Sequence, residues 1–471
     1  MSLSLAISSA LANLRSNQAQ ASIISRNIEN ASVLGYVRKD IQLSTRVVAG
    51  INLGVDVSVL RHVDERLIRD VRNAQSETGA LSAQKDILTR YTDTIGQPQD
   101  ERSVATLLTK LKTAYQGLVD RPGDAAFQRN VVDAAGKVAS SLRTMHAEAQ
   151  KARTDADRDI QDKVADINRN LQRIAELNRA LHGLDPDAGD AGALMDERDR
   201  AADALSRDLG VSTYLRDGDM VVVAKGGTTL VDSSANLLSA SPFGRIVTAD
   251  RTDLTPGAGN PNGLQGGALA GLVTIRDDTM PKVQAQLDEM ARGLVALFQD
   301  KDASRGAPPA DTGLFTDAGA ALDLAHTAGL AARIAVNDRV RPEAGGALWR
   351  VAAGMHADQP APGDSRQAQA FLDGFADQRS FDGRVGLAAS ATIQGYATGL
   401  VTSQQGLRTS VTSALEARTV TLESLKSARL GRDGVNIDDE LQKMTLVQKS
   451  YAASASVLSS VSQMMDTLLK I

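Results

Sequence analysis

The segment NIENASVLGYVRKD, residues 27–40, ends a regular apolar pattern that starts at the beginning of the chain. Apolar or small residues recur upstream at alternating intervals of four and three, as in a coiled-coil seam, with Asn17 as its polar interruption. Only Arg15, Arg26 and Glu29 are charged up to residue 31, whereas a solvated helix face carries more charge. The pattern fits an ordinary amphipathic helix, but it favours a helix contacted on several sides. Its positions are Leu3, Ile7, Ala10, Leu14, Asn17, Ala21, Ile24, Ile28 and Ala31.

The last segment of the chain has the same character. Its final 21 residues hold two charges, Asp466 and Lys470, and their serine and glutamine content argues against a membrane span. Because each end carries a heptad stripe and a nearly uncharged back, we expect the two ends to pair as a coiled coil. One column of the C-terminal stripe is Ile437, Met444, Tyr451, Leu458 and Met465, and a second is Val447, Val461 and Leu468.

The interior reads as helices interrupted by one Val- and Thr-rich part. Two dipeptides, Asp217-Gly218 and Gly226-Gly227, are typical of hairpin turns and indicate a small β unit. The sequence therefore predicts a mainly α, elongated, multi-domain chain with a small β insertion and nested architecture. The expected domains are a terminal coiled-coil assembly domain (1–45 and 430–471), a helical rod domain (46–210 and 268–429, with a mixed segment 301–380) and a small β domain (211–267).

Composition excludes several classes of function. The chain has 471 residues, a net charge of −5 without long like-charge runs, and no cysteine, so nothing suggests a nucleic-acid surface or a thiolate metal site. Its five histidines are scattered, no serine lies in a nucleophile elbow, and the run DERDR (196–200) reads as ion pairing on a helix surface. We expect no cofactor, no catalysis and no membrane insertion, and the N-terminus does not read as a cleavable signal.

The two ends resemble the terminal signatures of bacterial flagellar axial proteins. Gly35 is expected to end the first helix in the left-handed conformation, and Val33-Leu34 replaces the usual Thr-Pro before it. Three interior segments within 164–294 resemble, in order, the hook-associated protein 1 family of hook–filament junction proteins. The matching terminal residues are Asn27, Ile28, Asn30, Gly35, Tyr36 and Arg38, and Gly434, Val435, Asn436, Glu440, Gln448 and Tyr451.

This resemblance implies a structural flagellar subunit that is exported through the flagellar type III apparatus and is needed for filament assembly. The implied partners are identical subunits in a ring, the hook protein, a second hook-associated junction protein, and a cytoplasmic export chaperone on the C-terminal helix. The stripe residues at both ends are the expected assembly interface. A rod or hook subunit is the alternative, and its interior would be largely β. A hydrolase domain between coiled-coil ends is a third hypothesis, which lacks a converging set of polar residues.

Overall fold

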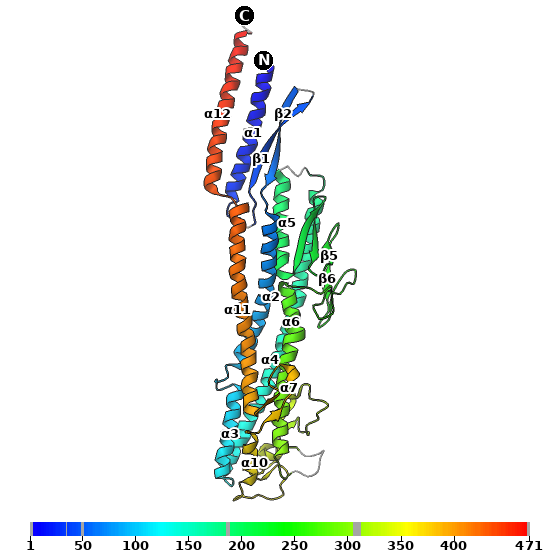
Figure 1. Cartoon of the computed structure of the whole chain (residues 1–471), viewed down its shortest axis with the longest axis vertical. Coiled ribbons are helices and arrows are strands. Elements are labelled where there is room, and N and C mark those ends of the chain that lie inside the picture. The colour runs from blue at the N-terminus through cyan, green and yellow to red at the C-terminus, as the bar shows by residue number, and fades with distance from the viewer. Residues whose placement is uncertain (1–2, 34, 49–50, 185–188, 305–311, 469–471) are drawn as a thin grey trace. The chain divides into compact units, whose positions relative to one another are not determined.

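A computed structural model gives the fold of the chain (Figure 1). It describes all residues except 1–2, 34, 49–50, 185–188, 305–311 and 469–471. The side chains of residues 3–6, 45–57, 189–190 and 468 also lie outside the described part. The chain forms two compact units, which are Met1–Ala80, Gln161–Ala270 and Glu416–Ile471 for unit 1, and Leu81–Ile160 and Gly271–Leu415 for unit 2.

Most of the described chain is helical. The helices are α1 (Leu3–Glu29), α2 (Glu65–Ile95), α3 (Val104–Asp120), α4 (Ala125–Leu181), α5 (Gly189–Asp208), α6 (Gly267–Thr274), α7 (Met280–Asp300), α8 (Leu330–Arg333), α9 (Arg350–Ala353), α10 (Arg366–Gly374), α11 (Ile393–Asp433) and α12 (Ile437–Leu468). A π-helical turn, Ile275–Thr279, joins α6 to α7, and Pro281, which has no N–H to donate, comes two residues after that turn. The predicted fold class, mainly α with a small β insertion, is confirmed by this element order.

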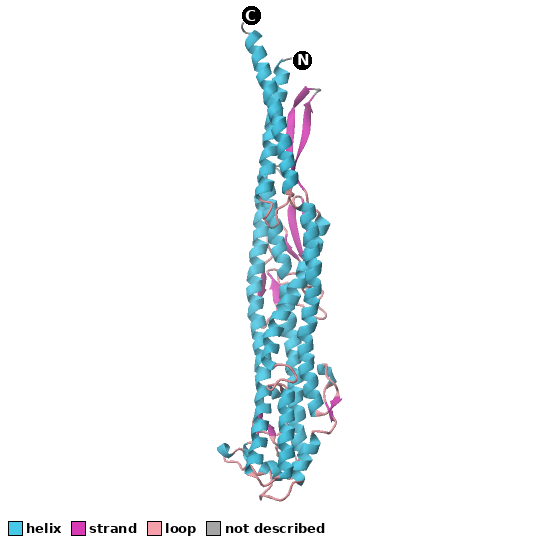
Figure 2. Ribbon diagram, turned by 90° about the vertical axis from the view of Figure 1, so that its left-hand side faces the viewer, coloured by secondary structure: helices cyan, strands magenta, loops and turns pink. Residues whose placement is uncertain are grey.

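The two terminal helices of unit 1 lie side by side (Figures 1 and 2). Both chain ends are at the same end of this pair, so α1 and α12 run antiparallel. The predicted pairing of the ends is therefore present, while a coiled-coil supercoil of the pair stays a prediction.

A β-hairpin packs along α1 and was not among the predicted elements. It pairs β1 (Lys39–Val48) with β2 (Ile51–Arg61) in antiparallel register, from Lys39 opposite Arg61 to Val48 opposite Ile51. Residues 46–61, assigned to the helical rod from the sequence, are thus mostly strand. The signal was available, because β-branched Val55, Val57 and Val59 alternate with other residues at the period of a strand.

The Val- and Thr-rich part of unit 1 forms two small sheets. The first has the order β3 (Val211–Arg216), β4 (Asp219–Ala224), β5 (Thr229–Val231), and the second pairs β6 (Leu238–Ala240) with β7 (Ile246–Thr248). Both predicted turns join β-strands, and positive φ angles of 53° at Asp217, 90° at Gly218 and 93° at Gly227 explain the residue choice. Asn178 of α4 fixes β4 from outside the sheet, since its amide bonds both polar backbone groups of Met220 at 3.0 Å.

Unit 2 is built around an aromatic core. Phe298 of α7 is fully buried, and its ring centroid lies 5.3–5.9 Å from those of four other aromatic rings. Short strands complete the unit: β8 (Phe315–Asp317) pairs with β9 (Ile334–Val336), and β10 (Arg379–Ser380) with β11 (Ser390–Ala391). The neighbours of Phe298 are Tyr115, Phe315, Phe371 and Phe375.

Candidate assembly site

Asn27, from the N-terminal signature, is the centre of a buried polar cluster in unit 1. Its side chain is fully buried near the end of α1. The Oδ1 atom accepts hydrogen bonds from the Tyr36 hydroxyl at 2.9 Å and from the Lys39 backbone N–H at 3.2 Å. The Nδ2 atom donates to the Lys39 carbonyl at 2.8 Å and to Glu440 Oε2 of α12 at 2.9 Å. One amide therefore joins the end of α1, the start of β1 and the first turn of α12.

Glu440 is the C-terminal half of this cluster and is fully buried. Its Oε1 atom accepts a hydrogen bond from Lys443 Nζ at 2.9 Å, and Lys443 also bonds to Asp40 Oδ1 at 2.8 Å. Burial alone raises the pKa of Asp40, but the hydrogen bond and charge of Lys443 outweigh it and hold that pKa below its usual value. The charge of Glu440 is thus balanced by a lysine from its own helix, which also reaches β1.

A buried ion network continues from the cluster into α5. Lys39 Nζ lies 2.5 Å from Asp196 Oδ2, and Arg61 reaches Asp196 Oδ1 at 2.7 Å and Asp199 Oδ2 at 2.8 Å. Burial lowers the pKa of Lys39, and the hydrogen bond with Asp196 opposes that shift. Lys39 and Arg61 are also paired residues of the hairpin, so α5 holds the base of β1 and β2 together.

This network corrects the interpretation of DERDR as surface ion pairing. Asp196, Arg198 and Asp199 are each less than 9% exposed. Arg198 donates to Asn178 Oδ1 at 3.1 Å and to the Gly218 carbonyl at 2.9 Å. Glu197, which pairs with Arg173 at a partly exposed position, and the exposed Arg200 fit the surface interpretation.

The turn between α11 and α12 explains two further signature residues. A Cβ atom on Gly434 would lie 2.2 Å from the Leu430 carbonyl oxygen, so the turn needs glycine there. Asn436 caps α12, because its Oδ1 accepts the Asp438 N–H at 3.0 Å. The acidic first turn of α12, which includes Glu440, suits the positive end of the helix dipole. This turn also contacts the hairpin base, since the Arg38 N–H donates to the Asp433 carbonyl at 2.8 Å.

Gly35 has a different role from the predicted one. Helix α1 ends at Glu29, several residues earlier, so Gly35 is not its left-handed C-terminal cap. Its φ of 81° still demands glycine, and a Cβ atom would lie 2.8 Å from Arg200 Cγ. The residue therefore allows the chain to turn closely past α5 before Tyr36 enters the cluster.

The other signature residues lie at the rim of the cluster. Ile28 is half-buried, and the Asn30 side chain donates to the Arg26 carbonyl of its own helix at 2.8 Å. Arg38 lies 3.6 Å from Asp40, and Gln448 is exposed on α12. The structure thus brings Asn27, Tyr36 and Glu440 together, but not Asn30 or Gln448.

Replacing Tyr36 with phenylalanine tests the cluster. Burial raises the pKa of Tyr36 to about 12, as expected for a phenol enclosed near carboxylates. Tyr36→Phe leaves one lone pair of buried Asn27 without its donor, so we expect a loss of about 1–2 kcal/mol of unfolding free energy. Hydrogen exchange of residues 27–40 measures it, and Tyr451→Phe, at an exposed position, is the control. Equal effects of the two substitutions would contradict the role of the hydroxyl.

The predicted stripe residues divide by burial into three groups. Ile24, Val447 and Val461 are buried, and the side chains of Leu3 and Leu468 lie outside the described residues. The half-buried positions are Ile7, Leu14, Ile28, Met444 and Leu458. The exposed positions are Ile437, Tyr451 and Met465.

Helix α12 therefore keeps a large apolar surface uncovered within one chain. Tyr451 and Met465 are 50% and 41% exposed on one flank of the seam. On the other flank, Leu446, Val457 and Met464 are 50–66% exposed. Exposed apolar surface of this extent on a single helix is typical of a protein contact.

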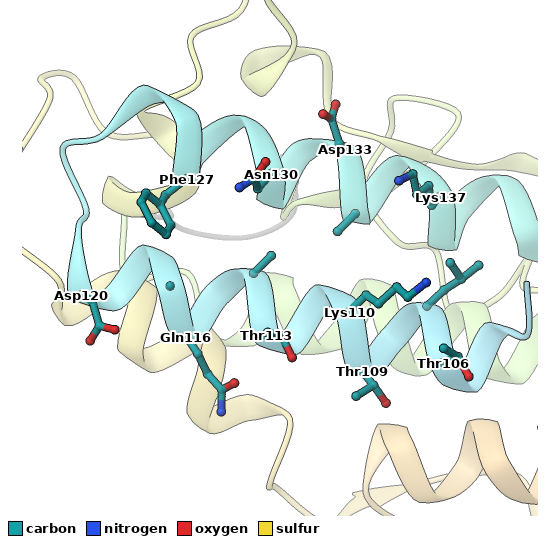
Figure 3. A pocket seen from close by; sticks show the side chains of 14 residues that line it. Thr106, Thr109, Lys110, Thr113, Gln116, Asp120, Phe127, Asn130, Asp133 and Lys137 are labelled. Carbon is teal, nitrogen blue, oxygen red and sulfur yellow. The ribbon is translucent and has the colours of Figure 1, made fainter. Parts of the chain in front are cut away.

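A groove lies between α3 and α4 in unit 2 (Figure 3). Phe127 lies at one end of it, Lys110 and Lys137 lie toward the other, and threonines line much of the α3 side. Among the described residues, no group of three His, Asp or Glu side chains could hold a metal ion. A search of the described helices for a segment both long and apolar enough to cross a membrane found none.

Comparisons with known proteins match the helical interior and the C-terminal end of the chain. The family model "Flagellar hook-associated protein FlgK helical domain" matches residues 88–304. A second, "Flagellar basal body rod FlgEFG protein C-terminal", matches residues 427–471, which include α12.

Relatives with the same description cover most of this chain. Flagellar hook-associated protein 1 of Salmonella typhimurium is 26% identical in an alignment of 326 residues that covers 64% of this chain, and the Salmonella typhi protein gives the same values. The alignment spans only 58% of each of these relatives. The solved flagellar hook junction protein FlgK from Burkholderia pseudomallei is 24% identical, with a TM-score of 0.43, over 53% of this chain and 46% of that one. The family models and the Salmonella relatives thus show that the chain is similar to flagellar hook-associated protein 1, and that its C-terminal segment is similar to that of flagellar basal body rod proteins.

Proposed function

We propose that this chain is a non-catalytic structural subunit of the bacterial flagellum, located at the junction between hook and filament and needed for filament assembly. The observation that carries the proposal is the exposed apolar surface of α12. While α12 packs against α1, apolar side chains on both of its flanks remain uncovered within one chain. A rod or hook subunit is the weaker alternative, because the matched interior, residues 88–304, has the hook-associated description.

The proposed partners follow from this role. Identical subunits form a ring through residues 1–45 and 430–471, the hook protein and a second hook-associated protein lie on either side, and an export chaperone covers α12 before assembly. The exposed side chains of Ile437, Tyr451 and Met465 support both uses of α12, since an amphipathic helix can bind one groove and later another. Export through the flagellar type III apparatus belongs to the same proposal.

Leu458→Asp tests the assembly surface. Leu458 is half-buried, beside the exposed flank of α12, so a carboxylate there would be desolvated on assembly at a cost of roughly 2–4 kcal/mol. We expect non-motile cells that keep their hooks and release flagellin into the medium, together with weaker chaperone binding in vitro. Leu458→Met, which keeps the apolar volume, should swim normally. Normal swimming of the aspartate strain would exclude this surface from assembly.

A further inference from the structure

The seam between α1 and α12 contains little that fixes how far one helix is shifted along the other. Buried Ala10, Asn17 and Ile24 repeat every seven residues on α1, and Val447 and Val461 lie fourteen apart on α12. A sliding movement of one heptad brings similar small apolar residues back into contact, so apolar packing alone discriminates poorly between registers. A polar contact at one position in the seam can supply this discrimination.

Two buried asparagines in α1 are candidates for this polar contact. Of the two, Asn27 has a hydrogen bond across the seam to α12. Asn17 is 6% exposed, and its Nδ2 atom has no hydrogen-bond partner in the described part of the chain. Asn27 is fully buried, and both polar atoms of its amide are bonded, including the 2.9 Å bond from Nδ2 to Glu440 Oε2. The stripe's obvious polar interruption, Asn17, therefore does not fix the register, whereas Asn27 can.

We propose that the Asn27–Glu440 hydrogen bond sets the register of α12 on α1 and thereby determines which side chains of α12 face outward. A shift of seven residues in one direction places Val447 opposite Asn27. The shift breaks the Asn27–Glu440 hydrogen bond. It leaves the Asn27 amide N–H and the Glu440 carboxylate unpaired at a site where both are buried. The surrounding contacts make Asn27 a rigid reference, because its Oδ1 is fixed by Tyr36 and Lys39.

The consequence for assembly rests on the proposed function. In this register Tyr451 and Met465 remain exposed on one flank of α12, and Leu446, Val457 and Met464 on the other. A shift along α1 would displace both flanks by one heptad, about 10 Å, relative to the rest of unit 1. Glu440 is thus a positioning residue for the proposed surface and makes no contact with a neighbouring subunit in this argument.

The cysteine-free sequence allows the register to be measured by disulfide trapping in the full chain. Counting from Asn27 and Glu440 along two antiparallel helices places position 14 opposite position 453, one residue from the half-buried position 454. Three double variants share Leu14→Cys and carry the second cysteine at 447, 454 or 461. With Glu440 present, we expect cross-linking at 454 and little at 447 or 461.

In the Glu440→Leu background, we expect the ratio of native to shifted cross-links to fall at least about tenfold, as for loss of a buried hydrogen bond to a charged group. Glu440→Gln keeps an acceptor oxygen and should keep the native pattern. Glu423→Leu, at an exposed position of α11, controls for an added leucine. Exclusive cross-linking at 454 in Glu440→Leu would overturn the proposal. Loss of all three cross-links would also overturn it, because Glu440 would then be needed for docking and not for register. Since the isolated chain is measured, this result is independent of whether Leu458→Asp cells swim.

Discussion

Asp196→Ala is expected to lower the unfolding free energy of unit 1 by about 3–5 kcal/mol, the usual cost of removing one partner from a buried ion pair. The Asp196 side chain is 2% exposed, and those of its partners Lys39 and Arg61 are 4% and 14% exposed. Without the carboxylate, Lys39 loses its charged partner and Arg61 keeps only Asp199. Burial already lowers the pKa of Lys39. After the loss of Asp196 this lysine can release its proton, so the expected loss of stability is smaller than that for a permanently charged group buried without a partner.

Hydrogen exchange of residues 58–80 and 191–210 under urea measures this loss locally, which is preferable because a chain with two units need not unfold in one step. The control is the adjacent residue: Glu197 pairs with Arg173, with side chains 37% and 47% exposed. Removing such a surface pair costs at most about 1 kcal/mol, so Glu197→Ala should change little. A loss below about 1 kcal/mol for Asp196→Ala as well would mean that water reaches Lys39 and Arg61.

The same residue explains why the sequence misled at this point. Asp196, Asp199 and Asp203 recur at intervals of three and four, which places one carboxylate on each turn of one helix face. With arginines between them, local partners were the obvious interpretation. Their actual partners come from β1, β2, α2 and α11, 131 to 157 residues away for Arg72 and Lys39 and 226 for Arg429. A pattern within one helix cannot indicate a cation that arrives from so far along the chain.

The long helices and the pairing of the terminal helices could be predicted from the sequence. Regular apolar spacing can be recognised within one segment, and the folded chain buries many of these apolar residues. Residues 125–181, inside the predicted helical rod, form α4, in which Ile167, Leu171 and Ile174 are fully buried. The site was predictable only in part. The resemblance identified Asn27, Tyr36 and Glu440 as motif positions, but their mutual hydrogen bonds depend on two segments 413 residues apart. Lys39, which completes the cluster, lay inside the quoted segment without any distinguishing feature.

Composition was also a poor guide to where the aromatic residues lie. An aromatic content of 3% favours slender helices at close contact over one thick core. However, six of the seven phenylalanines belong to unit 2, and four of them form its aromatic core, where Phe298 and Phe315 are 5.4 Å apart between centroids. An average over the chain hides such clustering. We expect this second core to stabilise unit 2 independently of the terminal cluster.

Phe298→Ala is accordingly expected to lower the unfolding free energy of unit 2 by about 3–5 kcal/mol, as for other buried phenylalanines. The side chain is fully buried in α7, and its ring meets Tyr115 at 5.6 Å and Phe371 at 5.3 Å between centroids. Truncation removes these aromatic contacts and leaves a cavity, which the helices α3 and α10 can close only by shifting toward α7.

Phe298→Ala should destabilise unit 2 without affecting the terminal cluster around Asn27. Hydrogen exchange of residues 104–120 and 366–375 should accelerate, while residues 27–40 keep their protection, because distant sites contribute additively. Leu324→Ala, in the same unit and 70% exposed, should stay within about 0.5 kcal/mol of the parent chain. Phe298→Leu should lose less than alanine because it refills part of the space. If Phe298→Ala instead loosened residues 27–40 as strongly as residues 104–120, the two units would unfold together, and the aromatic core would stabilise the assembly site directly.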